Sequence, residues 1–248
     1  MSQTEKAKAF AALHVKGRPI ILYNAWDAGS AKAIADAGAK AIATSSWAVA
    51  AAQGFKDGED IPLALMEQIA GRIAATVAKP VTIDFEGGYS DDDATLASNV
   101  TRLLDLGIVG INFEDRLVKG KGLYGVDRQA GRIAAVREAA ERKGVPLFIN
   151  ARTDVYLGNG DDVGEALKRG KAYASAGASG FFVPGVAAPD QIRRIAVDVP
   201  IPVNVMIMEG VPSNDELAQL GVARISYGAI PYAESMSALR EKAGKLFS

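Results

Sequence analysis

The 248-residue sequence contains no cysteine and a single histidine, His14. The absence of cysteine excludes disulfides, thiolate metal sites and thiol nucleophiles. His14 lies on a predicted helix and not at the end of a strand, so we expect it to be structural. A histidine-dependent catalytic triad and a histidine-rich zinc site are therefore excluded.

The sequence also lacks an excess of charge and any long apolar run. Its 28 basic and 29 acidic residues give a formal net charge of -1, which argues against a nucleic-acid partner and an anionic membrane surface. Apolar stretches are interrupted well before the roughly 18 residues that a membrane span needs. The polar first residues do not have the pattern of a secretory signal. We expect a cytoplasmic protein.

What the sequence does contain is a regular alternation of short apolar, β-branched segments with longer segments of helical period. Eight such units in roughly 250 residues predict an α/β fold, a (β/α)8 TIM barrel. We expect one domain over residues 1–248, and a doubly wound open sheet is the alternative. The predicted strands are Ile20–Trp26, Ala41–Ser46, Val81–Glu86, Val109–Asp115, Pro146–Thr153, Gly180–Pro184, Pro202–Ile207 and Ala223–Tyr227.

Helical periodicity follows the predicted strands, and several of these segments end in a glycine, which supplies the left-handed conformation that ends a helix. An extra N-terminal helix at Gln3–Val15 is expected to cover the bottom of the barrel, and a final helix is expected from about Tyr232 to Phe247. The other predicted helices include Leu63–Val77, Ala94–Leu106, Arg128–Arg142 and Val163–Ala176.

Acidic residues stand at the ends of two neighbouring predicted strands. Asp84 and Glu86 are two apart on a strand and share a face, and Glu114 ends the next strand. Because barrel active sites lie at the carboxyl ends of the strands, these carboxylates should converge and need a cation. Oxygen ligands favour Mg2+, or Mn2+, over zinc. Helix caps or surface ion pairs are the alternative for each acid alone, but the set, with Arg152 opposite, favours a site.

Five segments in this order resemble the isocitrate lyase and phosphoenolpyruvate mutase superfamily. The resemblance implies that Asp84 binds Mg2+ directly and that Glu86 and Glu114 hold metal-bound waters. The matching segments are residues 23–31 (YNAWDAGSA), 53–58 (QGFKDG), 84–89 (DFEGGY), 113–115 (FED) and 150–154 (NARTD).

The same resemblance implies how a small 2-oxo-acid substrate is held. Asp57, with Asp60 as the weaker candidate, matches an aspartate that contacts the metal site or the substrate. The turn Ser45-Ser46-Trp47 matches a turn whose backbone amides bind the substrate carboxylate, and Arg152 matches an arginine that pairs with it. Members of the superfamily commonly exchange their last helix, so a homodimer or homotetramer is expected.

The loop from Arg116 to Tyr124 distinguishes this chain from the lyases of the superfamily. It has neither the cysteine nor the histidine of their Lys-Lys-Cys-Gly-His sequence, so isocitrate or methylisocitrate cleavage by the usual route is not expected. Lys119 or Lys121 is the candidate catalytic residue on this loop.

Three hypotheses follow. The leading one is a Mg2+-dependent lyase or hydrolase that cleaves a carbon–carbon bond of an oxaloacetate-like 2-oxo acid through a stabilised enolate, with Tyr23 or a metal-bound water handling the proton. The second is phosphonate or phosphoenolpyruvate chemistry. The third is a non-catalytic 2-oxo-acid-binding protein.

Overall fold

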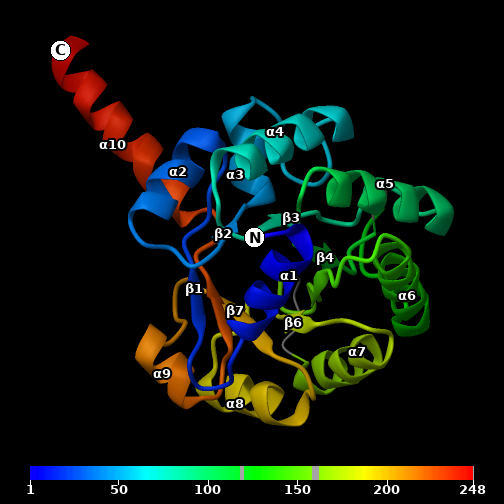
Figure 1. The fold of residues 1–248 in the computed structure, drawn as a ribbon. Coiled ribbons are helices and arrows are strands. Elements are labelled where there is room, and N and C mark those ends of the chain that lie inside the picture. The colour runs from blue at the N-terminus through cyan, green and yellow to red at the C-terminus, as the bar shows by residue number, and fades with distance from the viewer. Residues whose placement is uncertain (118–119, 158–161, 248) are drawn as a thin grey trace.

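The computed structural model describes residues 1–117, 120–157 and 162–247. Within them, eight parallel strands form one sheet in the order β1-β8-β7-β6-β5-β4-β3-β2, and a bridge between Ala25 and Thr44 joins the ends of the first and last strands in that order. The predicted TIM barrel is confirmed (Figure 1). The strands are β1 (Ile20–Leu22), β2 (Ile42–Ala43), β3 (Val81–Asp84), β4 (Gly110–Glu114), β5 (Phe148–Arg152), β6 (Gly180–Phe182), β7 (Val203–Met206) and β8 (Arg224–Ser226).

Helices surround the strands and bury their apolar faces against the sheet. Most predicted helices are found within a few residues of their expected bounds, and a short additional helix, α3, begins directly after β2. The helices are α1 (Gln3–Ala12), α2 (Ala28–Asp36), α3 (Ser46–Ala52), α4 (Leu63–Thr76), α5 (Asp93–Asp105), α6 (Val126–Arg142), α7 (Val163–Ser175), α8 (Pro189–Asp198), α9 (Asn214–Gln219) and α10 (Ile230–Phe247). No helix among the described residues is long and apolar enough to cross a membrane.

The N-terminal helix covers the amino end of the barrel, as predicted, although it ends at Ala12 and not at Val15. Phe10 is fully buried, and its ring centroid lies 5.3 Å from that of Phe148, at the start of β5. His14 stacks on the same ring at 4.0 Å, and its Nδ1 lies 2.9 Å from the Phe10 carbonyl oxygen. Burial, with a smaller effect from the charge of Arg224, lowers the pKa of His14 to about 3.

Close packing at this end requires a residue without a side chain at the start of β4. A Cβ at Gly110 would lie 2.7 Å from Thr82 Oγ1 and 2.9 Å from a ring carbon of Phe10. Both separations are shorter than real Cβ contacts, so the glycine makes room for the helix that covers the barrel.

The last helix, α10, extends away from the barrel and does not pack back over β1 (Figure 1). Leu239, Leu246 and Phe247 on this helix are 61%, 81% and 88% exposed. A groove of about 880 Å3 lies beside the uncovered outer face of β1, where Ile21 and Tyr23 are each 41% exposed. The helix that follows the last strand, α10, thus leaves apolar surface exposed both on itself and on β1.

Candidate active site

A cavity of about 230 Å3 opens at the carboxyl ends of the strands. All the charged side chains of its lining come from the β2-to-β5 half of the rim, and Asn24 and Ser226 add polar groups from the ends of β1 and β8. The lining residues are Asn24, Thr44, Ser45, Ser46, Trp47, Asp57, Asp84, Asn112, Arg152, Leu157, Phe182, Met206, Ser226, Gly228 and Ala229. This set includes six of the sequence-predicted site residues, namely Ser45, Ser46, Trp47, Asp57, Asp84 and Arg152.

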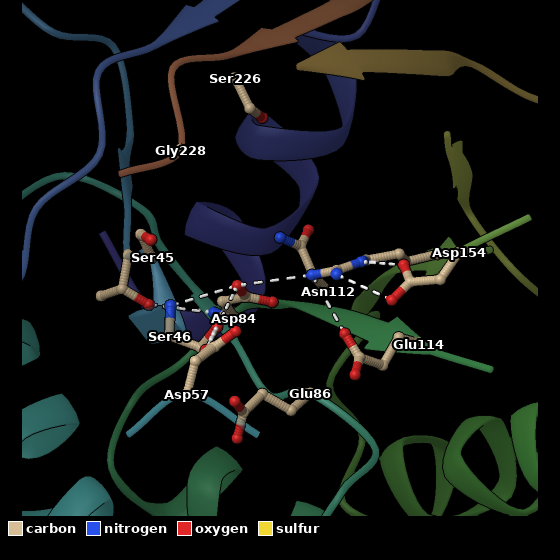
Figure 2. A network of polar contacts seen from close by, with 12 residues as sticks. Ser45, Ser46, Asp57, Asp84, Glu86, Asn112, Glu114, Asp154, Ser226 and Gly228 are labelled. Atoms are coloured by element: carbon tan, nitrogen blue, oxygen red, sulfur yellow. Dashed lines mark hydrogen bonds and ion pairs between the residues drawn. The ribbon is translucent and has the colours of Figure 1, made fainter. Parts of the chain in front are cut away.

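The turn after β2 is held by helix α3. Ser45 is the N-cap of this helix, and its hydroxyl accepts from the Ala48 amide. The Ser46 amide and hydroxyl both donate to Asp84 Oδ2, at 3.2 and 2.8 Å, and the hydroxyl lies 3.2 Å from Asp57 Oδ1 (Figure 2). The first amide of α3 therefore binds a side chain of the site, an interaction that the sequence did not predict for this turn.

Asp84 is the last residue of β3, and its two carboxylate oxygens differ in their contacts. Oδ2 accepts from Ser46 and lies 4.0 Å from Arg152 Nη1. Oδ1 is buried and forms no hydrogen bond to the described parts of the chain. Burying a carboxylate oxygen without a hydrogen bond costs free energy unless a cation or a hydrogen-bond donor contacts it. Asp84 therefore fits the direct metal ligand that the resemblance implies.

Glu86 lies in a turn that faces the loop carrying Asp57. It has a positive φ of 49°, and its two carboxylate oxygens accept from the backbone amides of Gly58 and Glu59, at 3.0 and 2.8 Å. Glu59 in turn accepts from the Tyr89 amide at 2.8 Å. Burial, followed by the charges of Asp84 and Asp57, raises the pKa of Glu86 to about 9. Its immediate structural role is to join two loops.

Glu114 and Arg152 form an ion pair across the ends of β4 and β5, with 3.0 Å between Glu114 Oε2 and Arg152 Nη1. Burial raises the pKa of Glu114 to about 8, and Arg152 opposes this shift. The guanidinium also binds Asp154 through two nitrogens, at 2.6 and 3.0 Å (Figure 2). This fork fixes the plane of Arg152 and leaves its Nη1 edge directed toward Asp84 and Glu114.

The donor set fits Mg2+ held largely through water. No group of three histidine, cysteine, aspartate or glutamate side chains among the described residues is arranged to hold a metal ion. Mg2+ commonly takes one or two carboxylates and keeps its waters. A Mg2+ ion with Asp84 as its one direct ligand, and with Glu86 and Glu114 contacting its waters, would fit both the lack of a three-residue ligand group and this preference of Mg2+.

One predicted catalytic residue, Tyr23, does not reach the cavity. Tyr23 lines the outer groove beside β1 and donates to Glu234 on α10 at 2.9 Å. The residue of this strand end that faces inward is Asn24, which is buried and lines the cavity. The alternation of buried and exposed positions along β1 explains why Asn24, and not Tyr23, faces the cavity, because successive side chains point to opposite faces. Lys119 lies outside the described residues.

Asp115 serves as a structural anchor behind the rim. It is fully buried and accepts from Arg169 Nη1, the Tyr173 hydroxyl and the Asp154 amide, at 2.9, 2.8 and 3.1 Å. Because Asp154 holds Arg152, this anchor positions the arginine of the site. The acid at the end of the matching FED segment thus acts from behind the cavity.

Eight parallel strands with an acidic and arginine-bearing carboxyl rim have the architecture of a barrel enzyme, in which this rim carries the active site. A family model described as phosphoenolpyruvate phosphomutase matches residues 10–247. The chain belongs to this family, and its predicted place in the isocitrate lyase and phosphoenolpyruvate mutase superfamily of enzymes is confirmed.

Three similar proteins illustrate the range of the family. A crystal structure of a proposed phosphonomutase from Burkholderia cenocepacia is 44% identical, with a TM-score of 0.95, and the match covers 98% of this chain and 99% of that one. Oxaloacetate decarboxylase of Ectopseudomonas mendocina is 29% identical over 98% of this chain and 86% of its own. A phosphonopyruvate hydrolase solved with oxalate and Mg2+ shares the fold, with a TM-score of 0.87 and 23% identity over 99% of this chain and 87% of that one.

Proposed function

We propose that this protein is a Mg2+-dependent lyase or hydrolase that cleaves a carbon–carbon bond of a small oxaloacetate-like 2-oxo acid. The observation that carries the proposal is Asp84 itself, whose buried Oδ1 forms no hydrogen bond to the described residues and whose Oδ2 lies 4.0 Å from Arg152 Nη1. Asp84 is suited to a cation and Arg152 to a carboxylate. A 2-oxo acid offers both a chelating pair of oxygens and a negative charge.

The chain's own residues would divide the work as follows. Asp84 would hold Mg2+, with Glu86 and Glu114 acting through water, and the ion would supply Lewis-acid stabilisation of enolate charge. Arg152, held by Asp154, would bind and orient the substrate carboxylate. Asp57 lines the cavity, 3.2 Å from the Ser46 hydroxyl, and would move a proton.

Calorimetric titration with oxalate tests the proposed site, and a substrate panel tests the chemistry. We expect oxalate to bind with Mg2+ and to bind much more weakly in EDTA. Oxaloacetate and other small 2-oxo acids of the panel should release pyruvate, CO2 or oxalate only when Mg2+ is present. Metal-independent turnover would contradict the proposal, whereas tight binding without turnover would favour a 2-oxo-acid-binding protein.

A second candidate is cleavage or rearrangement of a phosphorus–carbon bond. It is favoured by the 44% identity with the proposed Burkholderia phosphonomutase. Release of inorganic phosphate from phosphonopyruvate, or its conversion to phosphoenolpyruvate, would distinguish this chemistry from carbon–carbon cleavage. The same Asp84 and Arg152 would bind the shared 2-oxo-acid end.

We also propose that the protein is a homodimer or homotetramer in which α10 of one subunit covers the β1 groove of another. The exposed Leu239, Leu246 and Phe247 supply apolar side chains, and the groove offers the uncovered Ile21. Sedimentation should show dimers or tetramers for the full chain. A version ending at residue 229 should shift toward monomers, and a full chain that sediments only as a monomer would contradict the assembly.

A further inference from the structure

Four polar side chains fill the barrel interior next to the cavity. They are contributed by β4, β5, β7 and β8, and each is at most 5% exposed. Hydrogen bonds join them across the barrel axis, so that the strands contribute to one network. The four residues are Asn112, Asn150, Asn204 and Arg224.

The direction of the Asn112 amide is fixed by Arg224. Arg224 Nη2 lies 3.0 Å from Asn112 Oδ1, and a guanidinium can only donate, so the oxygen must face it. Asn150 Nδ2 donates to the same oxygen at 2.9 Å. Two buried donors therefore hold one acceptor, and the amide cannot turn over without placing its own NH2 group against them.

Backbone carbonyls fix the other end of the network. Asn204 Nδ2 donates to the carbonyl oxygens of Val205 and Arg224, at 2.9 and 3.2 Å. Asn204 Oδ1 is therefore left as the acceptor for Asn150 Nδ2, at 3.0 Å. The Asn150 amide thus has its orientation set from both sides, which reinforces the orientation of Asn112.

The consequence is a donor of fixed direction at the cavity. Asn112 lines the cavity, and its Nδ2 forms no hydrogen bond to the described residues. Asn112 is the register partner of Asp84 on β3, so the free amide lies beside the proposed metal ligand (Figure 2). An NH2 group there suits an anionic oxygen of a ligand.

Keeping Arg224 in the interior is expensive, which argues that its role is more than structural. The side chain is 1% exposed, and its Nε and Nη1 have no partner in the described parts of the chain. Burial lowers the pKa of Arg224 to about 9, with Asp84 acting in the opposite direction, so the group remains charged at neutral pH. An apolar side chain would fill the space at lower cost.

We infer that Asn112 donates a hydrogen bond from Nδ2 to an anionic oxygen of the bound 2-oxo acid, and that Arg224 is a positioning residue that aims this donor. The inference rests on the proposed function, because the ligand is the one proposed for the same site. Oxalate with Mg2+ is the probe, since it presents only the carboxylate oxygens.

The first test removes the donor in two ways. Asn112→Ala removes it without adding charge, and Asn112→Asp keeps the oxygen that Arg224 and Asn150 need, which protects folding. Both variants should bind oxalate about 10- to 100-fold more weakly, as expected for a hydrogen bond to a charged group. Asn112→Ala should bind Mg2+ alone as the wild type does. Asn214→Ala is the matched control, because Asn214 lies outside the cavity lining and donates to the Tyr227 hydroxyl.

The second test asks whether Arg224 acts through Asn112. Arg224→Met should weaken oxalate binding, Arg224→Lys should restore much of it, and Arg224→Met should have little further effect in an Asn112→Ala background. Wild-type protein that binds oxalate no more tightly than Asn112→Ala overturns the inference and leaves the proposed function standing. Wild-type protein that binds no oxalate with Mg2+ overturns both.

Discussion

At the carboxyl end of the barrel, Glu86 and Glu114 are buried acids whose pKa values burial raises to about 9 and about 8. At the amino end, His14 is a buried base whose pKa burial lowers to about 3. Burial favours the neutral form in both places. The ends differ in what surrounds these groups, because His14 stacks on an aromatic ring whereas the acids stand beside Asp84, Asp57 and Arg152.

The two ends of the barrel differ in the expected role of their residues, which is ligand binding at the carboxyl end and stabilisation of the fold at the amino end. The carboxyl end gathers four acidic side chains, Asp57, Asp84, Glu86 and Glu114, around Arg152, so its residues should matter most for activity. The amino end is filled by Phe10, His14 and Phe148, so its residues should matter most for stability.

The largest effect is expected from Asp84→Asn. The loss of charge on the proposed metal ligand should lower kcat/KM about 1000-fold and remove the Mg2+ response of oxalate binding. The free energy of unfolding of the metal-free protein should not fall, because a buried negative charge is lost. Steady-state kinetics and urea denaturation measure the two quantities. Asp198→Asn, on an exposed ion pair with Arg194, is the control, and an active Asp84→Asn enzyme would rule out the assignment.

Gly110→Ala should show the opposite pattern. Its Cβ would meet Thr82 and Phe10 at less than 3.0 Å, and overpacking of this kind costs about 3 kcal/mol. Urea denaturation should show this loss, while the folded enzyme keeps its KM. The matched substitution Gly131→Ala, on α6, has no heavy atom within 4 Å of its Cβ and should not destabilise the protein. Equal stability of the two variants would contradict the packing account.

The pH dependence of stability should expose His14. Because its pKa is lower in the folded than in the unfolded protein, the unfolded state binds more protons below about pH 6.5, and stability is lost as the pH falls. Between pH 7 and pH 5 this effect amounts to about 2 kcal/mol. Urea denaturation of His14→Gln should show a flatter profile over this range. A profile as steep as that of the wild type would assign the loss to other groups.

The smallest effect is expected from Tyr23→Phe. The hydroxyl reaches Glu234 on α10 and not the cavity, so kcat/KM should change less than about 2-fold, within the range of ordinary surface substitutions. Kinetics on the best substrate of the panel provide the measurement. A large loss in kcat alone would restore Tyr23 as a proton-transfer residue.

The barrel could be predicted because each strand is a short apolar run before a helix, and this local pattern can be recognised without knowledge of tertiary contacts. The sequence did not predict α3, because Ser45-Ser46-Trp47 was interpreted as a turn and the helix has only seven residues. Asp84 and Arg152 could be predicted because polar residues that end apolar strands stand out locally.

The interior network could not be predicted in the same way. Asn112 and Asn150 stand within apolar runs and Arg224 stands at the start of one, and nothing local shows that they meet across the barrel axis. Their meeting depends on the register of strands far apart in the sequence, since Arg224 and Asn112 are 112 positions apart. The position of Tyr23 was within reach of the sequence, because strand alternation places it on the face opposite Asn24.

Three non-glycine residues among the described ones have a positive φ, namely Glu59, Glu86 and Tyr89. They lie in two loops that are joined by hydrogen bonds to the carboxylates of Glu86 and Glu59. Such backbone conformations persist only where their surroundings enforce them. For protein engineering, the segments 54–60 and 85–89 therefore form one exchangeable unit. Transplanting the Asp57 loop alone from a relative would change the loop whose backbone amides bind Glu86 and whose Glu59 side chain binds the Tyr89 amide, so a redesign of substrate preference should move both segments together.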